Sequence, residues 1–165
     1  MIPYSYHTFL LPFEYSGKIL AENKNTITET KILSGENYVD YHDCFDWFRR
    51  LVEEYQIYPL KVGYDRYSAQ YLVEDMKQYG FHMDDVFQGF NLTPVIREFE
   101  GQIKDGVIHI GNNNLLKAHL LNSALKNDVE SQKVKLVKLG NRTRIDGAAA
   151  LLDALTVRQK WFSTY

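Results

Sequence analysis

The order of apolar runs and turn signals constrains the fold of this chain more than any other feature. Short runs typical of strands alternate with segments whose apolar residues recur at helical spacing, and glycine, proline or asparagine separates them. The expected helices cover 41–56, 67–79, 92–104, 114–126 and 145–162. The expected strands cover 4–13, 29–33, 60–65, 84–87, 107–110 and 133–139. This alternation indicates an α/β fold, a sheet with helices packed on its faces.

The length and composition fit a single globular domain covering residues 1–165. Hydrophobic residues make up 45% of the 165 residues and charged residues 24%, which suffices for one hydrophobic core. Cys44 is the only cysteine, so an internal disulfide and a cysteine-rich zinc site are excluded. No apolar run approaches the roughly 18–20 residues that span a bilayer, and the first residues lack the features of a secretory signal. We therefore expect a cytoplasmic protein without a membrane partner.

The overall charge does not indicate a nucleic-acid-binding protein, because the net charge is −2. If DNA is the partner, the positive charge that attracts it must be local. Five basic residues do gather within twelve positions: Lys133, Lys135, Lys138, Arg142 and Arg144. They fit either a solvated edge strand, where lysine discourages aggregation, or a ridge that contacts phosphates.

Two aspartates occupy positions at which α/β proteins place functional groups. Asp65 ends the expected strand 60–65, and ligands bind at the carboxyl ends of such strands. Asp146 stands at the start of the last expected helix, beside Gly147 and the small residues 148–150, which are expected to let this helix lie close against a neighbouring strand. Each aspartate also has a structural interpretation, as a helix cap or as a first-turn residue favoured by the helix dipole.

Other polar residues are expected to have structural roles. Asp153 shares a helical face with Asp146, but seven residues at about 1.5 Å each separate them by about 10 Å, too far to hold one ion pair. The neighbours Asp84 and Asp85 are expected in a solvated turn. His119 lies on an expected helix without a ligand partner at a recognised spacing.

Several motifs follow one another in a characteristic order: VGYDRYSAQYL, the turn at Gly80, Gln88-Gly89, GVIHIGNN, LNSALKNDV and KLGNRTRIDGAAALLDAL. In this order, they resemble the C-terminal nuclease domain of the large terminase subunit of tailed bacteriophages. The resemblance runs from Val62 to Ala154, and residues 36–58 are also similar to the segment that precedes the second acidic position of the family. The resemblance implies a ribonuclease H-like mixed sheet flanked by helices. It also implies an endonuclease that cuts concatemeric double-stranded DNA during packaging.

The resemblance assigns roles residue by residue. Asp65 matches the second acidic position of the family and Asp146 the third, so both are expected to be catalytic and to hold two Mg²⁺ or Mn²⁺ ions. Lys138 matches a lysine eight positions before the third aspartate. The residues expected to contact DNA are Lys138, Arg142, Arg144 and Arg66, although Arg66 could instead pair with Asp65.

One part of the family pattern has no counterpart. We find no strand carrying the first acidic position, and the chain begins at what resembles the second strand of the family. We therefore expect an N-terminally truncated domain that cleaves weakly or not at all and forms homo-oligomers through a vacant sheet edge.

The resemblance also implies partners, and two alternatives stay open. The expected partners are double-stranded DNA, the terminase ATPase domain, the small terminase subunit and the portal protein, in a bacterial host cell. No phosphate-binding loop of the ATPase motor occurs in this chain. One alternative is a non-catalytic prophage remnant that binds DNA or packaging proteins. The other is a different ribonuclease H-like nuclease such as a junction resolvase, which the negative net charge disfavours.

Overall fold

The computed structural model describes residues 41–67 and 70–162, and the expected strands 4–13 and 29–33 lie outside them. The helices are α1 (Tyr41–Glu53), α2 (Gln70–Tyr79), the 3-10 helix η1 (Phe90–Leu92), α3 (Thr93–Lys104), α4 (Asn114–Leu121) and α5 (Asp146–Trp161). The strands are β1 (Val62–Asp65), β2 (Met83–Val86), β3 (Ser123–Asp128) and β4 (Lys133–Lys138). The expected α/β class is confirmed.

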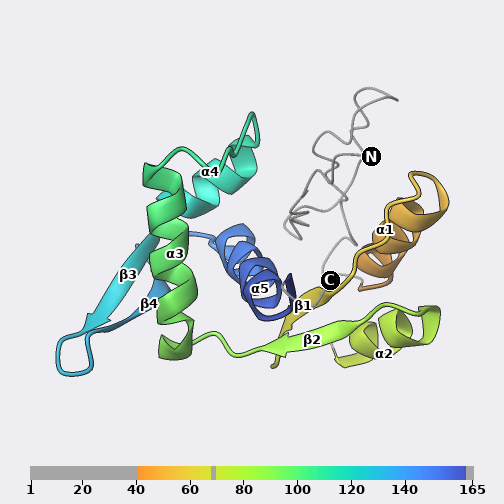
Figure 1. Cartoon of the computed structure of the whole chain (residues 1–165), viewed down its shortest axis with the longest axis horizontal. Helices are drawn as coiled ribbons and strands as arrows, with labels where there is room; N and C mark the ends of the chain where they lie inside the picture. Colours follow the sequence, from red (N-terminus) through yellow and green to blue (C-terminus); the bar gives the residue numbers. More distant parts are fainter. Residues whose placement is uncertain (1–40, 68–69, 163–165) are drawn as a thin grey trace.

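The strands of the described residues form two small sheets of different kinds. Strands β1 and β2 pair in parallel, from Val62 opposite Met83 to Asp65 opposite Val86. Strands β3 and β4 form an antiparallel hairpin. Helix α5 lies between the two sheets, with α3 and the hairpin on one side and the β1–β2 pair on the other (Figure 1).

The main core gathers around α5. Its buried members come from β2, η1, α3, β4 and α5: Val86, Leu92, Val95, Ile96, Val134, Leu152 and Val157. The Thr93 hydroxyl accepts a hydrogen bond from the backbone N–H of Val134 at 2.9 Å and lies 3.0 Å from its carbonyl oxygen. This threonine therefore links α3 directly to β4, which fixes the hairpin against the core.

Close packing places α5 against both β1 and α4. A Cβ atom at Gly63 of β1 would lie 2.7 Å from the backbone oxygen of Asp153, so only glycine fits there without a shift. At the start of α5, Gly147 lies against His119 of α4. The small residues that the sequence analysis noted at 147–150 therefore allow a close approach to a helix, while the close approach to a strand depends on Gly63.

Three expectations for local structure are wrong. The predicted helix 114–126 ends at Leu121. Residues Ser123–Asp128 form β3 instead, because all six of them pair with β4. The predicted strand 107–110 is irregular, and Val107 is 65% exposed. Asp84 and Asp85 lie within β2, which pairs with β1, and not in a turn. Basic side chains form ion pairs with both aspartates.

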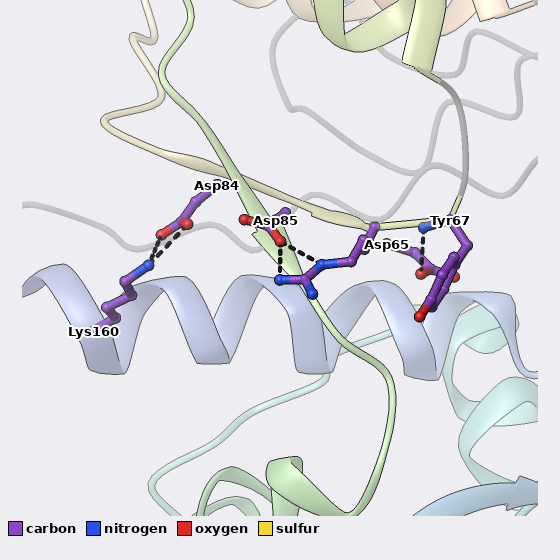
Figure 2. Close-up of polar contacts among 6 residues, drawn as sticks. Asp65, Tyr67, Asp84, Asp85 and Lys160 are labelled. Carbon is purple, nitrogen blue, oxygen red and sulfur yellow. Dashed lines mark hydrogen bonds and ion pairs between the residues drawn. The ribbon is translucent and has the colours of Figure 1, made fainter.

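The ion pairs of β2 tie it to its neighbours. Asp84 accepts hydrogen bonds from Lys160 at 2.9 Å (Figure 2). It also accepts a hydrogen bond from the indole of Trp161, and both donors lie at the end of α5. Burial would raise the pKa of Asp84, but these contacts lower it below its usual value.

Among the helices of the described residues, none has the length and apolar character that a membrane span requires.

Candidate active site

Asp65 ends β1, as predicted, and a local hydrogen bond holds its side chain. Its Oδ1 accepts the backbone N–H of Tyr67 at 3.2 Å (Figure 2). Helix α2 begins only at Gln70, so this bond stabilises a turn after the strand and Asp65 is not the cap of the helix. The carboxylate is half-buried and lies toward the half of α5 remote from Lys160.

A second carboxylate, from α5, belongs to the same neighbourhood. Gln88 follows β2, whose last residue pairs with Asp65. The side-chain amide of Gln88 donates to the backbone oxygen of Ala149 at 3.3 Å and to Oδ1 of Asp153. Asp153 is 7% exposed, so its carboxyl group is fixed between α5 and the ends of β1 and β2.

The surroundings of Asp153 disfavour its charged form. Burial raises the pKa of Asp153 from 3.8 to about 7, the Gln88 hydrogen bond acts in the opposite direction, and the negative charge of Asp65 adds to the effect of burial. Asp65 and Asp153 therefore belong to one electrostatic neighbourhood. Sequence reasoning missed this pairing because it measured Asp153 only against Asp146. The useful signal was Gly63, which lets α5 approach the strand that carries Asp65.

Asp146 is the exposed first residue of α5, where the helix dipole favours a negative charge. Its charge acts on His119 of α4, a residue that is 2% exposed. The Nδ1 atom of His119 accepts the backbone N–H of Gly147 at 2.8 Å, so this nitrogen carries no proton. Burial lowers the pKa of His119, while Asp146 opposes that effect. His119 therefore stabilises the start of α5, and the proximity of Asp146 to Asp65 stays a prediction.

Metal ligands are sparse in the described part of the chain. Within residues 41–67 and 70–162, no group of three or more His, Cys, Asp or Glu side chains could hold a metal ion. Asp65 and Asp153 do supply oxygen atoms, the ligands that Mg²⁺ and Mn²⁺ prefer. Because their charges repel each other, a cation beside them would be stabilised electrostatically, with water completing its coordination.

The predicted DNA-contacting residues have different environments. Lys138 ends β4, Arg142 and Arg144 lie in the loop before α5, and all three are exposed. Arg66 donates through its Nε to Asp85 at 2.7 Å, with a second ion-pair contact of 2.5 Å. The structure thus pairs Arg66 with Asp85 of β2.

The arrangement of strand ends, carboxylates and helix α5 can be compared with known proteins. The sequence model of the family described as "Terminase large subunit, endonuclease domain" matches residues 17–160. This chain belongs to that family. The predicted resemblance to the terminase nuclease domain is therefore confirmed. A search of curated proteins gives no match.

A solved structure agrees with the terminase endonuclease-domain assignment. The match is the crystal structure of the HK97 bacteriophage large terminase, which is 20% identical with a TM-score of 0.61. The match covers 72% of this chain and 25% of the HK97 terminase chain. At this identity the likeness concerns the fold. The mixed α/β structure of our chain thus corresponds to a part of a large terminase.

Proposed function

We propose that this chain is the metal-dependent endonuclease domain of a phage DNA-packaging terminase and hydrolyses phosphodiester bonds of double-stranded DNA. The observation that carries the proposal is the position of Asp65 at the carboxyl end of β1, in a member of the endonuclease-domain family. Carboxylates at strand ends are where α/β enzymes bind ligands. The proposal includes a ribonuclease H-like arrangement, to which the parallel β1–β2 pair and α5 would belong.

Asp65 and Asp146 are the proposed ligands for Mg²⁺ or Mn²⁺. Asp65 stands at the carboxyl end of β1, and Asp146 begins α5, the helix that packs against this strand. Asp65 and Asp146 would hold the metal, which would supply activation of a water and stabilisation of the leaving 3′ oxygen. The Tyr67 N–H holds the Asp65 carboxylate in position. Gln88 orients Asp153 and so keeps α5 at the edge of the sheet.

The exposed cations Lys138, Arg142 and Arg144 are the proposed phosphate contacts. Such contacts position DNA without reading its sequence, so sequence-tolerant cutting of concatemers is expected. Arg66 is a further proposed phosphate contact, and its guanidinium would have to contact the phosphate in addition to Asp85. In the complete packaging system, the proposed partners are the terminase ATPase domain, the small terminase subunit and the portal protein.

The test combines cleavage with metal binding. The 165-residue chain is incubated with supercoiled plasmid and Mn²⁺, with and without EDTA, beside the variants Asp65→Asn and Asp146→Asn. The matched control is Asp105→Asn, which changes an exposed aspartate at the end of α3. We expect weak cleavage by the parent chain at most, and we expect EDTA and both site variants to abolish it while the control keeps it.

Calorimetric titration of each protein with Mn²⁺ provides a readout that does not depend on turnover. We expect the parent and Asp105→Asn to bind Mn²⁺ weakly, and Asp65→Asn to lose this binding. Cleavage and Mn²⁺ binding that both survive Asp65→Asn would refute the proposed site. A parent chain that neither binds Mn²⁺ nor cuts DNA would refute the proposed function.

A further inference from the structure

Two exposed aromatic rings stand directly beside Asp65. Tyr67 is 77% exposed and Phe87 is 43% exposed, and their rings meet edge to face with centroids 6.1 Å apart. Tyr67 follows Asp65 by two residues, and Phe87 follows Val86, which pairs with Asp65. Figure 2 shows the Tyr67 ring next to the Asp65 carboxylate. We call the pair Tyr67 and Phe87 the aromatic ledge.

The surroundings of the aromatic ledge restrict both rings. The backbone N–H of Tyr67 is bound to Asp65, which ties the position of this residue to the carboxylate. The Phe87 ring lies so close to Gly89 that a Cβ atom there would be 2.6 Å from its Cε1 atom. Residue 89 therefore has to be glycine for the ring to occupy this place. The ledge is a positioned feature that remains open to solvent on its outer side.

We propose that the aromatic ledge receives an unstacked base of the DNA strand that is bound at Asp65. This inference rests on the proposed function, because it assumes a scissile phosphate beside Asp65. A nucleotide next to that phosphate is then within reach of Tyr67. Within a duplex the faces of the bases are covered by their neighbours, so an aromatic ring can stack only on a base that has left the stack.

The aromatic ledge predicts that the preferred substrate is DNA with unpaired bases at the cut site. Contacts from Lys138, Arg142 and Arg144 to phosphates would hold paired and unpaired DNA alike, since phosphates carry no information about pairing. The aromatic ledge adds a contact that only locally unpaired DNA can make. DNA with unpaired bases at the cut site is therefore bound more tightly than fully paired DNA of the same sequence.

The test measures binding to two duplexes of equal length that differ only in a central two-base mismatch, by fluorescence anisotropy with Ca²⁺ in place of Mn²⁺. We expect the parent chain to bind the mismatched duplex more tightly. Tyr67→Ala should weaken binding to the mismatched duplex about 5- to 150-fold, the typical effect of losing one aromatic–base stack. Its binding to the paired duplex should not change. Alanine keeps the backbone N–H that Asp65 accepts, so the carboxylate stays in place.

Matched variants separate stacking from general effects. Tyr67→Trp should restore the preference for the mismatched duplex, and Gly89→Ala should reduce it by displacing the Phe87 ring. The control is Tyr58→Ala, which removes a tyrosine that is 68% exposed. Tyr58 precedes the first residue of β1, whereas Asp65 is the last residue of this strand. This control should behave like the parent chain. Circular dichroism establishes that each variant is folded.

The outcomes distinguish this inference from the proposed function. If the parent binds both duplexes equally, or if Tyr67→Ala and Tyr58→Ala behave alike, the ledge has another occupant and the inference is overturned. Loss of cleavage in Asp65→Asn would leave the proposed function standing in that case. Conversely, a mismatch preference that depends on Tyr67, together with cleavage that survives Asp65→Asn, would support the ledge and refute the proposed catalytic site.

Discussion

Replacing Asp153 by asparagine removes a buried carboxyl group and keeps an oxygen atom that can accept the Gln88 hydrogen bond. The pKa of this carboxyl group rises from 3.8 to about 7 on folding, chiefly because burial penalises the charged form. A group whose pKa is raised on folding favours the folded state at low pH, and this contribution is lost as the pH rises from about 4 to about 7. The wild-type chain should therefore lose stability over this range, and Asp153→Asn should not.

The size of the effect follows from the two pKa values. One pKa unit corresponds to about 1.4 kcal/mol, so at pH 8 the ionised Asp153 lowers the free energy of unfolding by roughly 4 kcal/mol. At pH 5 the carboxyl group is mostly ionised only in the unfolded state, and the loss is roughly 2 kcal/mol. The stability of Asp153→Asn relative to the parent should thus increase by about 2–3 kcal/mol between pH 5 and pH 8.

Urea denaturation followed by circular dichroism gives the free energy of unfolding of both proteins at each pH, in EDTA so that no cation binds the carboxylates. Taking the difference between variant and parent cancels the titration of all other groups. Asp105→Asn, at an exposed position, is the control and should show a difference that does not vary with pH. If the difference for Asp153→Asn is equally flat, the reasoning that places a buried, repelled carboxyl group beside Asp65 is wrong.

Four further substitutions test the packing and the DNA contacts. Gly63→Ala should destabilise the fold by about 1–3 kcal/mol through overpacking against α5. Gly101→Ala, in α3 with open space around it, should stabilise it by about 0.5–1 kcal/mol; thermal melts compare the two. His119→Ala leaves the Gly147 N–H without its acceptor and should cost at least about 1–3 kcal/mol in urea denaturation. Lys138→Ala should reduce the slope of log K against log salt for DNA binding by about 1, and an unchanged slope would exclude a phosphate contact.

Helical spacing, apolar runs and turn residues predicted those helices and strands whose ends are marked clearly in the sequence. The predicted helices 92–104 and 145–162 correspond to α3 and α5 within one residue at each end, and the predicted strand 60–65 contains β1. The segment that forms β3 carries leucine, alanine and lysine, which favour helices, and only its pairing with β4 makes it a strand. The run 107–110 shows the reverse case, because its β-branched residues pair with none of the strands in the described part of the chain.

The candidate site divides in the same way. Asp65 was predictable because it stands where an apolar strand ends, a local property of the sequence. The place of Asp153 depends on tertiary packing between residues 90 positions apart (153 − 63), where the missing side chain of Gly63 admits α5. The Gln88 hydrogen bond adds a third distant segment. Sequence spacing along one helix could measure Asp153 only against Asp146 and gave no information on these contacts.

The late position of α5 in the chain has a consequence for the order of events on the ribosome. Asp65 is synthesised 81 residues before Asp146 (146 − 65) and 88 residues before Asp153 (153 − 65). At about 5–20 residues per second, roughly 4–18 seconds pass before its partners exist. Until α5 has left the exit tunnel and packed on Gly63, the nascent chain presents one isolated carboxylate. Under the proposed function, a ribosome-bound chain would gain cleavage competence only after α5 has been synthesised and has packed on Gly63.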